Sequence, residues 1–159
     1  AAMESGLVRV SFDGGASPNP GPAGAGAVLQ DESGVTIWTG AHYVGPAATN
    51  NEAEYWGLIL GLEGAARGPW RRVEVRGDSN LVVGHMTGVY AVKAPRLKAL
   101  YQRAKALVAH FEQVHFQHVP RAQNAQADAL ATAGRDNRAA HELLAAAQPA
   151  AGNRRISAA

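Results

Sequence analysis

The 159-residue chain contains no cysteine. This absence excludes disulfide bonds, thiolate zinc sites and cysteine nucleophiles. No apolar run approaches the roughly 20 residues that a membrane-spanning helix needs. The N-terminus also lacks the basic and apolar regions of a signal peptide. The sequence therefore predicts a cytoplasmic protein that has no membrane partner.

Hydrophobic residues make up 47% of the chain and charged residues 18%, proportions typical of a globular protein with one core. We expect one domain over residues 7–137. Residues 1–6 precede it as an N-terminal extension, in which the two alanines ahead of Met3 resemble a cloning remnant. Residues 138–159 follow it as an Ala-rich tail that is expected to be partly disordered.

The net charge is only +2, but the charges are unevenly distributed. Between Arg71 and Arg121 there are nine Lys or Arg residues and three acidic residues. A basic region beside an acidic cluster suits a metalloenzyme that binds a polyanion. The alternative, which the charge pattern taken alone favours, is a helix with a solvated basic face.

The first part of the chain has the pattern of three strands joined by turns. Polar and apolar residues alternate over 7–12, and the Gly- and Pro-rich segment GGASPNPGP that begins at Gly14 has the composition of a turn. Thr49 and Glu52 have the spacing of a capping box and predict a helix that ends near Arg67. The first three strands are expected at 7–12, 23–30 and 35–43.

The remaining pattern alternates strands with helices. The strands are expected at 73–76 and 114–119, and the helices at 79–88, 94–110 and 123–134. The order βββαβααβα predicts an α/β protein with a sheet of mixed direction, in which helical crossovers join the later strands.

Four acidic residues lie either directly after a predicted strand or within a predicted helix: Asp13, Glu54, Asp78 and Asp128. Asp13 and Asp78 each follow a predicted strand, and ligands of open α/β sheets gather beyond the carboxyl ends of strands. The alternative is that Asp13 belongs to an ordinary strand-exit turn and that Asp78 caps the next helix. Asp128 has the alternative of a solvated helix face.

Glu52 and Glu54 have different expected roles. Glu52 is the third residue of its helix and can bond back to the cap, so a structural role is expected for it. Glu54 leads a stripe of apolar residues along the same helix, where a carboxylate is uncommon without a partner. Position therefore favours Glu54 over Glu52 as a functional residue.

Two other kinds of site find no support in the sequence. The segment GGASPNPGP matches neither of the common glycine-rich nucleotide-binding patterns, and its prolines remove backbone donors. The chain also lacks the G-x-S-x-G turn of serine hydrolases.

Four segments, taken together and in this order, resemble the motifs of type 1 ribonuclease H: DGGASPNPGPAG, TNNEAEYWGL, RGDSN and HVPRAQNAQADALA. The resemblance covers roughly residues 7–135 and is to the bacterial and plant-like branch. The segment 87–94 is too short for the basic protrusion that some relatives carry. The resemblance implies a three-layer fold, with a five-stranded mixed sheet flanked by helices.

The resemblance also implies an activity, which is hydrolysis of the RNA strand of RNA/DNA hybrids to leave 5′-phosphate and 3′-hydroxyl ends. The catalytic and metal-binding carboxylates of the family fall on Asp13, Glu54, Asp78 and Asp128. Two Mg²⁺ ions, with Mn²⁺ as an alternative, are the implied cofactors, and their preference for oxygen ligands suits four carboxylates. An RNA/DNA hybrid is the implied partner of a monomer that requires no protein partner.

Other residues are expected to contact the substrate at or near family positions: Gly14, Asn19, Thr49, Asn50, Asn51 and Asn80. Because the basic protrusion is missing, Lys93, Arg96 and other basic side chains are expected to bind the hybrid instead. For Asn19 a turn role remains open, and Thr49 is a helix cap in either case. His118 matches a histidine that is proposed to assist proton transfer or product release, with packing at the strand exit as the alternative. Two rival functions are a catalytically silent hybrid-binding module and a DNA-acting relative of the same fold.

Overall fold

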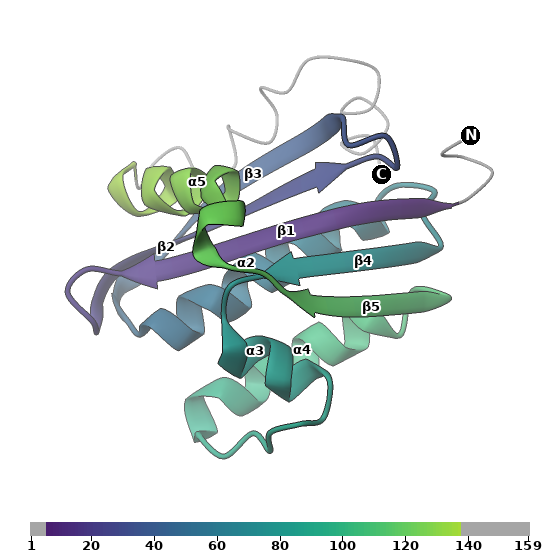
Figure 1. Ribbon diagram of the computed structural model, residues 1–159. Helices are drawn as coiled ribbons and strands as arrows, with labels where there is room; N and C mark the ends of the chain where they lie inside the picture. The colour runs from purple at the N-terminus through teal and green to yellow at the C-terminus, as the bar shows by residue number, and fades with distance from the viewer. Residues whose placement is uncertain (1–5, 138–159) are drawn as a thin grey trace.

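The computed structural model describes residues 6–137, which form one five-stranded sheet with helices on both faces (Figure 1). The strand order is β3-β2-β1-β4-β5. Strands β1, β2 and β3 pair antiparallel, whereas β4 lies parallel to both β1 and β5. The strands are β1 (Leu7–Ala16), β2 (Gly21–Gln30), β3 (Thr36–Ala48), β4 (Arg72–Gly77) and β5 (Gln113–His118).

The helices are distributed over the two faces of this sheet. Helices α2 and α4 pack together on one side, and α5 crosses β1, β2 and β3 on the other (Figure 1). The helices are α2 (Asn50–Ala66), α3 (Asn80–Met86), α4 (Pro95–Val108), the 3₁₀ turn η1 (Arg121–Gln123) and α5 (Ala125–Asp136). The predicted order βββαβααβα and the three-layer fold are confirmed.

Three elements differ most from their predicted bounds. Strand β1 continues beyond residue 12 through Ala16, because Gly14, Gly15 and Ala16 of the predicted turn segment pair with β2. Strand β3 continues beyond residue 43 because Gly45 and Ala48 still pair with β2 across an irregular register. A proline is tolerated there because β3 is an edge strand. The last predicted helix is divided, because Asn124 has the non-helical dihedral angles φ −124° and ψ 26° between η1 and α5.

The core lies mainly between the sheet and α2. Val8, Val10 and Phe12 alternate along β1 toward this helix, and Leu58 and Leu62 are fully buried opposite them. Arg9 and Ser11 alternate with these residues and face the other side of the sheet. Asp13 continues their alternation, so it lies on the face that α5 covers. Within the described residues, no helix has the length and apolar character needed to cross a membrane. The predicted tail over 138–159 lies outside the described residues.

Helix α2 and strand β1 touch through glycine on both sides. A Cβ atom added to Gly14 would lie 2.0 Å from the carbonyl oxygen of Ala53, and one added to Gly57 would lie 2.3 Å from that of Asp13. Both neighbouring atoms belong to the backbone, so neither clash could be relieved by the movement of a flexible side chain. These glycines allow the start of α2 to reach the end of β1.

The Gly57→Ala variant is therefore expected to be less stable, although alanine favours helices by about 1 kcal/mol over glycine. Overpacking of a tight contact costs about 1–3 kcal/mol, and here the clash is with backbone. Urea unfolding measures the difference. A variant as stable as the parent would show that the backbones are not in contact at this point.

Candidate metal-binding active site

Three carboxylates from separate elements meet at one end of the sheet. Asp13 lies on β1, Glu54 on α2, and Asp78 follows β4 directly. One carboxylate oxygen from each residue lies within 4.8 Å of the other two. The structure thus brings together three of the four acidic residues that the sequence singles out.

The parallel pairing of β1 and β4 explains how Asp13 and Asp78 meet. Phe12 is in register with Gly77, so the two strands reach the following aspartates at the same level of the sheet. The alternative prediction that Asp78 caps α3 is wrong. Ser79 is the cap, and its side chain accepts a hydrogen bond of 3.1 Å from the amide of Val82. The carboxylate of Asp78 therefore remains available to the cluster.

The two glutamates of α2 have the different positions that the sequence predicts. Glu52 completes the capping box, with Oε1 accepting from the amide of Thr49 at 2.9 Å. Glu54 is placed in the carboxylate cluster instead. The start of α2 therefore contains a structural glutamate, Glu52, and a glutamate of the carboxylate cluster, Glu54.

Asp128 reaches the same cleft from the opposite face of the sheet. It lies in the first turn of α5, lines the cleft, and is near enough to Asp13 to raise the pKa of that carboxylate, so the alternative of a purely solvated face is wrong. The buried amide of Asn124 anchors this helix, because its Nδ2 donates to the carbonyl oxygen of Phe12 at 2.8 Å. This bond ties the start of α5 to the residue that precedes Asp13.

Burial and mutual repulsion make this cluster costly to ionise. Burial, with repulsion from Asp78 and Asp128, raises the pKa of Asp13 from 3.8 to about 7. Burial, with repulsion from Asp13 and Asp78, raises the pKa of Glu54 from 4.5 to about 10. Within residues 6–137, none of the four carboxylates has a Lys, Arg or His ion-pair partner to offset this repulsion.

These features fit a divalent cation. Oε1 of Glu54 is fully buried and has no hydrogen-bond partner, which is costly for a carboxylate oxygen unless a cation faces it. The donors are all carboxylate oxygens, which suit hard ions such as Mg²⁺ and Mn²⁺. A bound cation would relieve both the repulsion and the unmatched oxygen.

The four carboxylates lie in an open cleft of about 610 Å³. His118 and Asn50 also line it, together with Arg121, Thr132 and Arg135 from the last two helical segments. His118 is exposed, and its Nε2 lies 3.2 Å from the carbonyl oxygen of Asp78. It therefore sits at the cleft and is not packed away at the strand exit.

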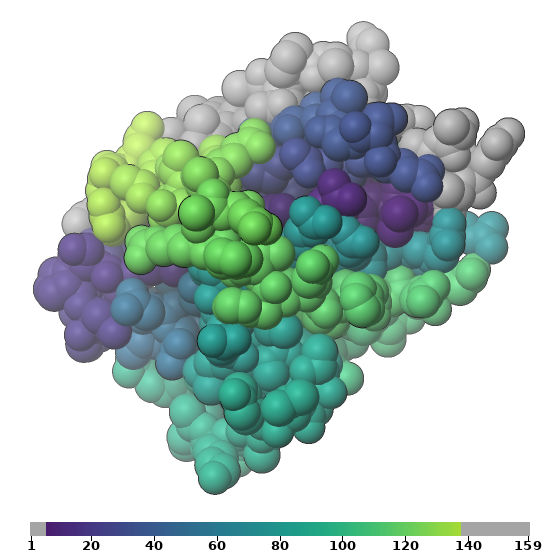
Figure 2. Space-filling view, viewed as in Figure 1, coloured from purple at the N-terminus to yellow at the C-terminus, as the bar shows by residue number. Residues whose placement is uncertain are grey.

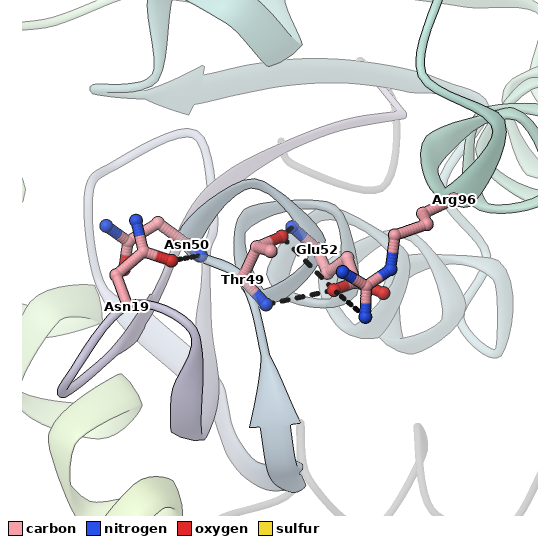
Figure 3. A network of polar contacts seen from close by, with 5 residues as sticks. All are labelled: Asn19, Thr49, Asn50, Glu52 and Arg96. Carbon is pink, nitrogen blue, oxygen red and sulfur yellow. Dashed lines mark hydrogen bonds and ion pairs between the residues drawn. The ribbon is translucent and has the colours of Figure 1, made fainter.

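Polar residues at the start of α2 form two sets of contacts beside the cleft (Figure 3). The amide of Asn50 donates to Oδ1 of Asn19 at 2.9 Å, and Oδ1 of Asn50 accepts from the amide of Ala16 at 2.7 Å. The hydroxyl of Thr49 is engaged with Glu52 as a cap. Asn19 and Asn50 thus join the β1–β2 turn to α2, a link that the sequence does not reveal.

The remaining residues predicted to contact the substrate differ in their surroundings. Arg96 forms a long ion pair of 3.7 Å with Glu52, which links α4 to the start of α2 (Figure 3). Asn51, Asn80 and Lys93 are exposed and do not line the carboxylate cleft, whereas Gly14 does.

Sequence reasoning missed three residues of this region: Arg121, Asn124 and Arg135. Asn124 stands four residues before Asp128, one helical turn, and this spacing is the signal that was available. Arg135 stands seven residues after Asp128, a spacing that returns to the same helix face. Arg121 carries no such signal, because the 3₁₀ turn that places it was not predicted.

Comparisons with known proteins agree with this geometry. The family model described as reverse transcriptase-like matches residues 11–134. Ribonuclease HI of Halobacterium salinarum is 42% identical over 132 residues, which cover 83% of this chain and 66% of that protein. The chain belongs to this family as a type 1 ribonuclease H.

One further relative is represented by both its sequence and a solved domain. The bifunctional protein Rv2228c of Mycobacterium tuberculosis is 43% identical over 143 residues, which cover 90% of this chain. The chain spans only 39% of that protein's length. The solved N-terminal RNase H domain of Rv2228c has a TM-score of 0.78, with 41% identity over 84% of this chain and 96% of the domain structure.

A second solved structure is LC11-RNase H1 in complex with RNA/DNA hybrid. It has a TM-score of 0.77 and 39% identity, covering 83% of this chain and 99% of that one. The predicted family is therefore confirmed, and the short α3–α4 segment over 87–94 contains no helix, as expected for a member without the basic protrusion.

Proposed function

We propose that this protein is an endoribonuclease that hydrolyses the RNA strand of RNA/DNA hybrids and leaves 5′-phosphate and 3′-hydroxyl ends. The observation that carries the proposal is the convergence of Asp13, Glu54 and Asp78 within 4.8 Å in an open cleft. Similarity to ribonuclease HI and to a structure with RNA/DNA hybrid supports the choice of substrate.

Asp13, Glu54, Asp78 and Asp128 are the residues that would hold the divalent metal. Magnesium is the proposed cofactor, as two ions, with manganese as the alternative. When bound, such ions supply a nucleophile from water at neutral pH and charge stabilisation for an in-line displacement.

The residues of the chain have their own proposed tasks around the scissile phosphate. Asp13 and Glu54, the more buried carboxylates, fix the position of positive charge at the base of the cleft. Asp78 and Asp128 close the cleft from two further elements. His118 is exposed at its edge and lines the cleft, so we assign it an assisting role in proton transfer or product release.

Recognition of RNA requires contact with the 2′-hydroxyl, which both donates and accepts hydrogen bonds. The backbone of Gly14 and the side chain of Asn50 line the cleft and are the proposed contacts closest to the carboxylates. Asn19 and Thr49 are proposed to hold this rim in shape, and Asn51 and Asn80 to contact the substrate from exposed positions.

Hybrid binding is expected to depend steeply on salt. Without a basic protrusion, the proposed contacts to phosphates are Lys93, Arg96 and neighbouring exposed basic side chains. Each neutralised phosphate contributes roughly 0.7–0.9 to the slope of log affinity against log salt. Equilibrium binding between low and physiological salt measures this slope, and an affinity that barely changes would contradict the proposed contacts.

A panel of labelled substrates tests the proposed activity. The protein is incubated with RNA/DNA hybrid, duplex RNA and duplex DNA, each with Mg²⁺, with Mn²⁺ and with chelator. Metal-dependent cutting of RNA in the hybrid alone is the expected result. Hybrid that is bound but left intact would identify a silent binding module, and cutting of duplex DNA would identify a DNA-acting relative.

The proposed enzyme acts as a monomer, since one chain supplies all four carboxylates of the cleft. Its proposed location is the cytoplasm. Light scattering after gel filtration, with activity measured across the peak, tests the monomer. Activity confined to a dimer fraction would contradict it.

A further inference from the structure

The carboxylate cleft does not end at the carboxylates. A second, shallower hollow of about 450 Å³ is lined by Ser17, Pro22, Arg135 and Asp136. Arg135 lines both hollows. In Figure 2 the yellow-green end of α5 lies beside the purple β1–β2 turn, where this second hollow is found. The two hollows therefore adjoin at Arg135.

The position of Arg135 relative to the carboxylates is fixed by the packing of α5. Asp128, Thr132 and Arg135 follow one face of the helix and all line the cleft. A Cβ atom added to Gly24 would lie 2.2 Å from the amide nitrogen of Arg135, so the helix backbone rests directly on β2. Seven residues at roughly 1.5 Å per residue place Arg135 about 10 Å along the axis from Asp128.

The guanidinium of Arg135 has donors to offer a ligand. Its Nε donates to Oδ1 of Asp136 at 3.0 Å, in an ion pair in which the Asp136 side chain is 63% exposed. Such exposed pairs contribute little to stability and are readily exchanged. Arginine is the side chain best suited to bind phosphate through two parallel hydrogen bonds.

We propose that Arg135 binds a backbone phosphate of the nucleic acid two or three nucleotides from the scissile phosphate, so that the substrate strand runs from the carboxylates past Thr132 toward the β1–β2 turn. The spacing follows from the distance along α5 for a duplex whose axis runs parallel to this helix, because one strand advances about 3.4 Å per nucleotide along that axis. This inference rests on the proposed function and adds a contact and a direction to it.

The test is a scan in which single phosphates of a hybrid are replaced, one at a time, by neutral methylphosphonates. Binding is measured in an Asp78→Asn background, so that no cleavage occurs, with and without Arg135→Gln. Methylphosphonate at one position is expected to weaken binding about 10-fold in the protein that has Arg135. The same replacement should not weaken binding further in the Arg135→Gln protein. Arg135→Gln is also expected to lower the salt slope by roughly 0.7–0.9.

Arg71→Gln is the matched control. Arg71 pairs with Glu112 at 2.8 Å, is exposed, and immediately precedes the opposite end of β4. The Arg71→Gln variant removes the same charge as Arg135→Gln and is expected to leave the salt slope and the phosphate map unchanged. In active protein, Arg135→Gln should raise KM about 10-fold with little change in kcat, and Arg135→Lys should recover part of the loss.

Two results would overturn the contact. One is an identical phosphate map with and without Arg135. The other is a loss of thermal stability that accounts for the whole loss of activity, which would make Arg135 a structural residue of α5. If the unmodified protein neither binds nor cleaves hybrid, the proposed function itself fails. If it cleaves hybrid and the maps are identical, only the Arg135 contact fails.

Discussion

The Asp13→Asn variant is expected to lose RNA cleavage by about 1,000-fold or more, since removal of a metal ligand forfeits several kcal/mol of charge stabilisation. Asp13 is 6% exposed and has a carboxylate oxygen within 4.8 Å of one from Glu54 and one from Asp78. Asparagine has nearly the same shape but no negative charge, so the fold should be retained. Initial rates on labelled hybrid, with circular dichroism as a check of folding, measure the effect.

The matched control for this variant is Glu52→Gln. Glu52 lies two residues from Glu54 on the same helix, but it serves the capping box, in which glutamine can take the place of glutamate. Most of the activity should therefore remain. Near-normal activity of Asp13→Asn, or equal losses in the two variants, would contradict a metal site built on Asp13, Glu54, Asp78 and Asp128.

The second large effect concerns the stability of the metal-free protein as pH rises. Folding raises the pKa of Asp13 from 3.8 to about 7, so between these values the folded protein binds more protons than the unfolded chain. Stability from this group is therefore fully present below pH 4 and is lost as pH rises through about 7. The raised pKa of Glu54 extends the loss to higher pH.

Asp13→Asn removes this cost and is expected to be more stable than the parent in chelator at pH 8. The difference should be near zero at pH 4 and should grow to roughly 2–4 kcal/mol, since each pKa unit corresponds to about 1.4 kcal/mol. Urea unfolding of both proteins across this pH range measures it. Mg²⁺ should stabilise the parent more than the variant, and a difference that does not vary with pH would contradict a strained carboxylate cluster.

The sequence predicts most of the fold because its local signals agree with the tertiary structure. Alternation over residues 7–12, the capping box of Thr49 and Glu52, and the proline before Arg96 each correspond to an observed element boundary or face. The preference for Glu54 over Glu52 also follows from local position. Local pattern is sufficient here because one buried stripe decides the orientation of a helix.

The features that the sequence does not predict depend on contacts between distant segments. The extension of β3 through Pro46 follows from pairing with β2, and the break at Asn124 accompanies a bond to Phe12, 112 residues away in the chain. The place of Arg135 depends on glycines of β2 that let α5 approach. The spacings of Asn124 and Arg135 from Asp128 indicate a shared helix face, but no local pattern shows which distant segment each residue contacts.

The most direct test uses a duplex in which one DNA strand contains a short central run of ribonucleotides and both ends carry labels. With Mg²⁺, every cut is expected within or at the border of the ribonucleotides, with 5′-phosphate on the downstream fragment and 3′-hydroxyl on the upstream one. Chelator and Asp13→Asn should each abolish these cuts. Cuts in the DNA, cuts that persist in chelator, or 2′,3′-cyclic phosphate ends would contradict metal-dependent hydrolysis by water at the four carboxylates.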